Sequence, residues 1–201
     1  MIKKKSKGEL TKERIVSEAI GLMANHGFVD TTFQMIADKI ELTQASIFKH
    51  YPTKKELFRG ILSYILQTNH QLVSGRLNSS MNAKERLFAH CEGNIAWAKK
   101  YPEQAQMILL LYYYGTHDEE LRATYCEILS IGQSRIDEYL QAGLREKLIK
   151  VKSQELELYV GIFHELLMGM IINIISTPKK LSDLNHKKSW QKLELLYNQL
   201  S

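Results

Sequence analysis

A His-Glu pair in the apolar C-terminal part of the chain is the first candidate for chemistry. His164 and Glu165 begin like the zinc-protease motif His-Glu-x-x-His, in which two histidines on one helix face bind one metal ion. Met168 stands where the second histidine would be, so no zinc site is predicted. The sequence has no Gly-rich phosphate loop and no Gly-x-Ser-x-Gly turn, and Cys91 and Cys126 are isolated. We therefore predict that the chain is not an enzyme and uses no cofactor or metal.

A short helix near residue 50 offers a different chemistry. Thr43 is a good N-cap and Pro52 ends the segment, so a helix is predicted between them. Ile47, Phe48 and Tyr51 supply its inward face. The outward face is small, polar and basic, and consists of Gln44, Ala45, Ser46, Lys49 and His50. Because glutamine can pair with adenine and lysine can reach guanine, such a face can read bases in a major groove.

The positive charge of the chain is concentrated in the same region. The 201 residues include 27 Lys+Arg and 22 Asp+Glu, which gives a net charge of +5. Residues 1–60 hold 11 of the basic and 7 of the acidic residues, and thus +4 of that charge. Lysines also keep small domains in solution, so charge alone leaves a polyanion-binding surface and a merely solvated surface equally open.

Two further helices are predicted to position this segment. Thr11 can cap a first helix, which ends at the left-handed stop formed around Gly27. A Thr-x-x-Gln capping box from Thr31 to Gln34 begins a second, short helix. The residues just before Thr43 interrupt its apolar pattern. These signals predict two short helices joined by a tight turn.

The first sixty residues resemble the tetracycline-repressor (TetR) family of bacterial transcription regulators. The resemblance covers roughly residues 11–60 and rests on Gly27-Phe28, Thr31-Thr32, Ile36-Ala37, the run from Leu42 to Tyr51, Lys54 and Leu57-Phe58. It implies an all-α homodimer with an N-terminal three-helix helix-turn-helix DNA-binding domain and a C-terminal helical ligand-binding and dimerisation domain. The implied partners are double-stranded DNA with a palindromic operator, a second copy of the chain and a small-molecule effector.

The sequence departs from the family pattern at two positions. Glu41 stands in the turn where the family usually has Gly or another small residue, and Ala45 stands where Gly is common. A positive φ at Glu41 would cost on the order of 1 kcal/mol. Both changes keep the motif, but they leave the preferred operator sequence open.

The start of the fourth helix is predicted to hold the DNA backbone. Thr53 and Glu56 form a second capping box, and a helix N-terminus beside lysines favours phosphate. By resemblance, Lys54 clamps the backbone. The predicted DNA-binding residues are Thr32, Gln44, Ala45, Ser46, Lys49, His50, Tyr51 and Lys54. The lysine-rich tail at residues 3–7 is expected to be a flexible arm with nonspecific DNA contacts.

The remaining chain is predicted to form amphipathic helices. They lie near residues 83–100, 103–114, 118–147, 154–176 and 183–200. The run from Leu158 to Ile175 is nearly long enough to span a membrane, but His164, Glu165 and Asn173 would be costly in lipid. We therefore predict a helix buried inside protein, and no membrane partner.

Two roles are predicted for this second part. The apolar helix needs cover on more than one side, and the resemblance implies that the last two helices of each subunit form the dimer interface. Candidate interface residues are Gly161, Gly169, Trp190, Leu193 and Tyr197. Aromatic and methionine side chains suit a small-molecule pocket, although they equally suit an ordinary core. Candidate ligand contacts are Trp97, Tyr101, Met107, Tyr114, Phe163, His164 and Met168.

The expected organisation is a basic flexible arm at 1–10, a helix-turn-helix domain at 11–53 and a sensing and dimerisation domain at 54–201. The predicted function is transcriptional repression that a small, largely apolar ligand relieves. Two alternatives stay open: a DNA-binding protein of the same fold controlled by a protein partner, and a repurposed helical carrier or enzyme. The low cysteine content fits a cytoplasmic compartment.

Overall fold

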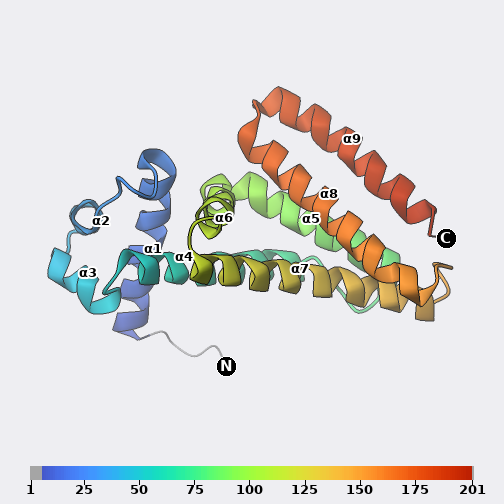
Figure 1. Ribbon diagram of the computed structural model, residues 1–201, viewed down its shortest axis with the longest axis horizontal. Helices are drawn as coiled ribbons and strands as arrows, with labels where there is room; N and C mark the ends of the chain where they lie inside the picture. Colours follow the sequence, from blue (N-terminus) through green and yellow to red (C-terminus); the bar gives the residue numbers. More distant parts are fainter. Residues whose placement is uncertain (1–5, 201) are drawn as a thin grey trace.

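The fold is built from helices, as predicted. A computed structural model describes residues 6–200, apart from the side chains of residues 179–182, 184 and 185 (Figure 1). Within these residues the helices are α1 (Lys7–His26), α2 (Phe33–Lys39), α3 (Gln44–His50), α4 (Lys54–Ser74), α5 (Ala83–Lys100), α6 (Pro102–Gly115), α7 (Glu119–Arg145), the short 3-10 helix η1 (Ser153–Glu155), α8 (Leu156–Ser176) and α9 (Lys179–Asn198). The last helix therefore begins and ends earlier than the predicted range of 183–200.

Helix α1 begins before the predicted cap. Ser6 is the N-cap: its hydroxyl accepts from the Glu9 amide at 3.3 Å, and the Glu9 carboxylate accepts from the Ser6 amide at 2.7 Å. The prediction that Thr11 is the cap is therefore wrong, because the Thr11 hydroxyl lies inside the helix and donates to the Lys7 carbonyl. Residues 7–10, assigned to a flexible arm, form the first turn of α1. Residues 1–5 of that arm lie outside the described residues.

A tight turn joins α2 to α3, as predicted. The N-cap of α2, at the other end of that helix, lies one residue later than predicted. Thr32, rather than Thr31, caps α2 by accepting from the Met35 amide at 3.2 Å. Thr31 is buried, and its hydroxyl donates to the backbone carbonyl at position 27. Glu41 has φ 55°, so the cost considered for a left-handed residue at this position applies, and Thr43 caps α3 as predicted.

Helix α4 connects the N-terminal helices to the rest of the molecule. The Thr53–Glu56 capping box is present at its start. Helix α4 packs against α1 and α5, while α7 packs against α5, α6 and α8 (Figure 1). The buried apolar side chains form one cluster that runs from Ile15 to Leu200. Because the core is continuous across residue 53, the division into two domains remains a prediction.

Helix α8 is only partly buried within the single chain, so the predicted cover on its second side stays a prediction. Phe163 and Leu167 lie in the core, whereas Leu158 and Ile162 are 64% and 36% exposed. Among the described helices, the stretch Ser153–Ser176 is long and apolar enough to cross a membrane, a test that core helices of water-soluble proteins also pass. Helix α9 packs along α8 and leaves the exposed face uncovered in the single chain (Figure 1).

Candidate nucleic-acid interface and ligand cavity

Helix α3 presents the predicted polar face to solvent. Its N-cap Thr43 accepts from the Ser46 amide at 3.2 Å, and Ile47 anchors the helix in the core. Gln44, Ala45 and Lys49 are exposed, whereas Ser46 and His50 are half-buried. The first turn of α3 carries no acidic side chain, and its last turn carries two basic ones. The face therefore combines hydrogen-bonding groups with positive charge and little steric bulk.

Phe48 does not lie on the inward face, contrary to the prediction. Its side chain is 44% exposed and meets the Phe33 ring edge-on, with centroids 4.8 Å apart. Phe33 comes from the start of α2, so the two rings brace the turn between α2 and α3. Tyr51 is half-buried beside Gly60, where an added Cβ would lie 2.6 Å from the tyrosine ring. That close contact fixes the end of α3 against α4.

Lys54 is held by neighbouring groups rather than extended into solvent. Its Nζ donates to the Val29 carbonyl at 2.7 Å and lies 4.9 Å from the centre of the Phe28 ring. Burial lowers the pKa of Lys54, and Asp30 opposes that shift. One of the three ammonium hydrogens is therefore engaged, which leaves two for a further acceptor. The exposed Thr32 hydroxyl oxygen is used as the cap of α2.

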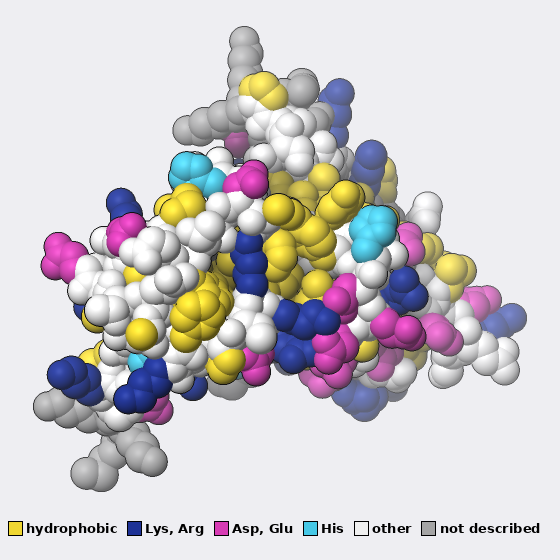
Figure 2. Space-filling view, turned by 60° about the vertical axis from the view of Figure 1, so that its left-hand side comes forward, with side chains coloured by type: hydrophobic (Ala, Val, Ile, Leu, Met, Phe, Trp, Pro, Cys, Tyr) yellow, Lys and Arg dark blue, Asp and Glu magenta, His cyan; other side chains and the backbone are white. Residues whose placement is uncertain are grey.

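Ion pairs connect the start of α4 to the start of α7. Lys55 Nζ lies 2.7 Å from Asp118 Oδ2 and also pairs with Glu120, which lies 2.9 Å from Arg59 Nη2. Hydrogen bonds from Lys55 lower the pKa of both carboxyls. Figure 2 shows acidic and basic side chains in contact around an open patch of hydrophobic side chains on one face of the molecule. Lys55 is thus engaged within the chain.

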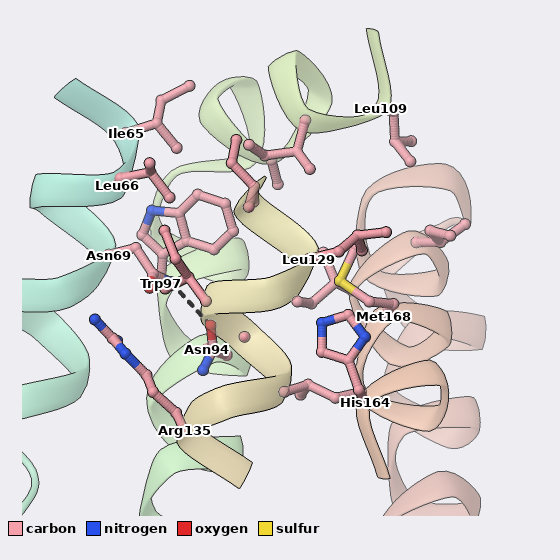
Figure 3. A pocket seen from close by; sticks show the side chains of 18 of the residues that line it. Ile65, Leu66, Asn69, Asn94, Trp97, Leu109, Leu129, Arg135, His164 and Met168 are labelled. Atoms are coloured by element: carbon pink, nitrogen blue, oxygen red, sulfur yellow. Dashed lines mark hydrogen bonds between the residues drawn. The ribbon is translucent and has the colours of Figure 1, made fainter. Parts of the chain in front are cut away.

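A cavity of about 200 Å³ lies between α4, α5, α6, α7 and α8 (Figure 3). Three of the seven predicted ligand contacts line it: Trp97, His164 and Met168. Figure 3 shows His164 and Met168 on α8, with Trp97 on the opposite side of the cavity. The wall is mainly apolar, with the aliphatic side chains of Ile65, Leu66, Ile108, Leu109, Ile128, Leu129, Leu167, Ile171 and Ile172.

The other four predicted ligand contacts lie elsewhere. Met107 and Phe163 are fully buried core side chains, and Tyr101 lies at the junction of α5 and α6. Tyr114 contacts Phe28, with ring centroids 4.8 Å apart, at the boundary between the N-terminal helices and α6. These four predictions of lining residues are wrong for this cavity, because composition does not show which side of a helix faces a void.

A polar network in the cavity was missed by the sequence analysis. The Asn69 amide donates to Asn94 Oδ1 at 3.0 Å, and the Asn94 amide donates to the His90 carbonyl at 3.0 Å. Arg135 Nη2 lies 3.0 Å from His70 Nδ1. Asn69, His90, Asn94 and Arg135 all line the cavity. A usable signal was the spacing of His90 and Asn94, since residues four apart share one helix face.

Burial favours the neutral form of both histidines in the cavity wall. Burial, with smaller contributions from Arg135 and His164, lowers the pKa of His90 to about 4. Burial also lowers the pKa of His164. His90 Nδ1 is buried and has no hydrogen-bond partner among the described residues. One unsatisfied imidazole nitrogen therefore lies in the cavity wall.

The candidate dimer residues fall into two groups. An added Cβ at Gly161 or Gly169 would meet nothing within 4 Å, so both positions lie on the open side of α8. Leu193 and Tyr197 are 1% and 2% exposed, and Tyr197 packs on Phe88 within the same chain. Trp190 is half-buried and also contacts the Phe88 ring. Leu193 and Tyr197 are therefore core residues rather than surface available to a partner.

Comparison with known proteins places the N-terminal helices in a described family. Residues 15–61 match the model of bacterial regulatory proteins of the tetR family. A "Probable acrEF/envCD operon repressor" from Escherichia coli K12 is 25% identical over 150 residues, which cover 69% of this chain and 66% of that protein. The chain thus spans about two thirds of the length of this relative.

Solved structures share the whole fold. A TetR transcription regulator from Haloarcula marismortui has a TM-score of 0.81 at 15% identity, with 94% of this chain and 97% of that chain covered. A protein from Saccharomonospora viridis, solved in complex with choline, has a TM-score of 0.80 at 18% identity, with 92% and 96% covered.

Proposed function

We propose that the chain, whose residues 15–61 match the tetR family of bacterial regulatory proteins, is a dimeric repressor that binds operator DNA through α3. The observation that carries this proposal is the outward face of α3, which exposes Gln44, Ala45 and Lys49 on a helix anchored by Ile47. The relative from E. coli is named as an operon repressor, which favours repression over activation. Such a regulator works on the chromosome, so a cytoplasmic location follows.

The residues of this surface take different roles in the proposal. Gln44 and Lys49 contact base edges, and the small Ala45 and Ser46 side chains let α3 lie deep in the major groove. The remaining contacts go to the DNA backbone and involve Thr32, His50, Tyr51 and Lys54. Lys54 stays bonded to the Val29 carbonyl and uses its other ammonium hydrogens for phosphate.

Dimerisation through α8 and α9 supplies the second half of the site. The uncovered face of α8 carries Leu158, Gly161, Ile162 and Gly169, and Leu195 of α9 is 65% exposed. Two copies of α3 spaced about 34–36 Å apart would read successive major grooves of a palindrome. Linking two weak half-sites in this way produces one strong site.

Control by a small molecule is supported by the cavity and by its links to the N-terminal helices. The cavity touches α4, α6 and α7. Helix α6 contacts the N-terminal helices through Tyr114 and Phe28, and α7 contacts α4 through the Lys55–Asp118 pair. A ligand that binds one arrangement of these helices more tightly would shift the spacing of the two α3 helices. A ligand with equal affinity for both arrangements would have no effect.

The proposal is tested by selecting fragments of the source genome with the purified protein at near-physiological salt and footprinting the enriched fragment. We expect a palindrome with half-sites one or more helical turns apart. The double variant Gln44→Ala/Lys49→Ala is the matched control and should lose the enrichment while it stays folded. If no fragment is enriched at any salt concentration, the proposal is wrong, and control by a protein partner or a carrier role becomes the better explanation.

A further inference from the structure

We infer that the cavity between α4 and α8 takes a small amphipathic molecule with an apolar body and a single anionic head, and that Arg135 selects the charge. The inference rests on the proposed function, since it names the class of effector that would act there. Two features of the cavity carry it: its wall and its charge.

The wall sets the size and the apolar character of the ligand body. Its volume of about 200 Å³ lies below the roughly 300–1,000 Å³ of sites for drug-sized molecules, so the body is small. The one polar group of the Trp97 side chain is already satisfied, because its indole N–H donates to Gln104 Oε1 at 3.0 Å. Most of the wall therefore offers only apolar contact, which favours an alkyl or aryl body.

The charge of the cavity comes from one residue. Arg135 extends from α7 toward α4, where Asn69 lies (Figure 3). Its described hydrogen bond goes to the ring nitrogen of His70, and no carboxylate among the described residues forms an ion pair with it. No Asp or Glu lines the cavity. An arginine without a carboxylate partner beside an apolar cavity is suited to bind an anionic head.

His90 also belongs to the cavity wall, but its free ring nitrogen faces the protein interior. His90 is 3% exposed, lines the cavity, and has no hydrogen-bond partner at Nδ1 among the described residues. Its Nε2 lies 3.3 Å from the Asn94 amide nitrogen, which can only donate, so Nε2 accepts and Nδ1 carries the proton. This buried nitrogen has almost no accessible surface, so a ligand oxygen in the cavity does not reach it, and Arg135 remains the group that selects the head.

These features oppose a cationic ligand. A bound cation would need an acidic group or aromatic faces free of competing positive charge. Trp97 and Tyr125 lie in the wall, but Arg135 adds positive charge to the same cavity. The Saccharomonospora viridis protein of the same fold was solved with the cation choline. We therefore expect the two proteins to differ in the charge of the ligand they accept.

The test uses three probes with the same eight-carbon chain: octanoate, octan-1-ol and octylamine. Their affinities for the full-length protein at pH 7 are measured by isothermal titration calorimetry. We expect octanoate to bind at least about tenfold more tightly than octanol, and octylamine to bind most weakly. Arg135→Gln should weaken octanoate about tenfold and change octanol less than about twofold, whereas Arg135→Lys should keep the preference.

The control variant is Arg145→Gln, which removes an exposed arginine from the last turn of the same helix and should leave all three affinities unchanged. The inference is overturned if octylamine or octanol binds as tightly as octanoate, if none of the three binds, or if Arg135→Gln weakens octanoate and octanol equally. Operator binding by the unliganded wild-type protein is measured separately. Loss of selectivity with intact DNA binding refutes only this inference, whereas selective octanoate binding without any DNA binding refutes only the proposed function.

Discussion

Lys49 and Lys54 have different surroundings although both belong to the N-terminal helices. Lys49 is exposed on α3 and forms no ion pair or side-chain hydrogen bond with the described residues, so its charge can reach a base edge. Lys54 is half-buried at the start of α4 and is bonded to the Val29 carbonyl, which holds its ammonium group at one place on the surface. A mobile cation suits base recognition, and a fixed one suits a phosphate at a set position.

Replacement of each lysine by alanine should therefore have a different effect on DNA binding. Lys49→Ala is expected to relax the preference at one base pair and to cost about 1–3 kcal/mol on the operator. Lys54→Ala is expected to weaken operator and random DNA alike and to reduce the slope of log affinity against log salt by about 1. Fluorescence anisotropy titrations over several salt concentrations measure both, with Lys152→Ala as the surface control. Equal effects of both variants on both DNAs would contradict this division.

His90 should make the stability of the protein sensitive to acid. Its pKa falls from the ordinary 6.5 to about 4 on burial. Between these pH values the unfolded chain binds the extra proton, so the free energy of unfolding decreases as pH falls through this window. The loss between pH 7 and pH 4 is at most about 3 kcal/mol.

Denaturant unfolding at pH 7, 5.5 and 4 measures this loss. His90→Gln should remove part of the pH dependence, because a glutamine does not titrate in this range. His26→Gln, which replaces an exposed histidine at the end of α1, should leave the dependence as in the wild type. If the three proteins lose stability in parallel as pH falls, burial of His90 does not control the acid response.

At the scale of elements, the crossing of α4 and α5 depends on a glycine. An added Cβ at Gly93 would lie 3.0 Å from both the Cα and a methyl group of Val73. Because the contact includes backbone, relief requires the two helices to separate. The steric contact should therefore make Gly93→Ala less stable than the wild type by about 1–3 kcal/mol. The higher helix propensity of alanine offsets at most about 1 kcal/mol of that loss.

Thermal or denaturant unfolding tests this crossing against a matched glycine. Gly21 lies in α1, and an added Cβ there would meet nothing within 4 Å. Gly21→Ala should stabilise the protein by about 0.5–1 kcal/mol, since only the propensity term applies. A Gly93→Ala variant that gains stability like Gly21→Ala would show that α4 and α5 can separate at little cost.

Local sequence signals predicted the elements well because helix caps depend on neighbouring residues. The caps at Thr43 and Thr53 are as expected. The cap of α2 was placed one residue early, because only Thr31 has a glutamine three residues later. Burial instead turns the Thr31 hydroxyl to the carbonyl at position 27 and leaves the cap to Thr32. The Ser6 capping box was overlooked because it lies among lysines that suggested a flexible arm.

The cavity was less predictable because it depends on how five helices pack. Of the residues named from their type as ligand contacts, Trp97, His164 and Met168 line the cavity. They could not separate these from Met107 and Phe163, which have the same chemistry but face the core. The side chain that gives the cavity its charge, Arg135, lies on an amphipathic helix where a surface role is the ordinary expectation. Only the arrangement of α7 against α4 reveals it.

For the whole molecule, the open face of α8 is the feature that a second copy would explain. Leu158, Ile162 and Ile172 are all exposed, and their spacing places them on one side of the helix with Gly169. About a third of the most apolar stretch of this helix is buried in the single chain. The exposed carboxylate of Glu165 lies among these apolar side chains. Exposed apolar side chains gathered on one face and bordered by polar ones are typical of an interface with another protein. The same pairing would set the distance between the two copies of α3.

Leu158→Lys should therefore convert the protein to a monomer at concentrations where the wild type is a dimer. Burial of an unpaired ammonium group in the interface is strongly unfavourable, and loss of the second α3 should weaken operator binding by about 10²–10⁴-fold.

Sedimentation velocity measures the mass, and anisotropy measures affinity for the full palindrome and for one half-site. Leu10→Lys makes the same substitution at an exposed leucine of α1 and should remain a dimer. Half-site affinity should be the same in wild type and Leu158→Lys, since α3 is unchanged. A wild-type protein that sediments as a monomer, or a Leu158→Lys variant that remains a dimer, would move the interface away from α8.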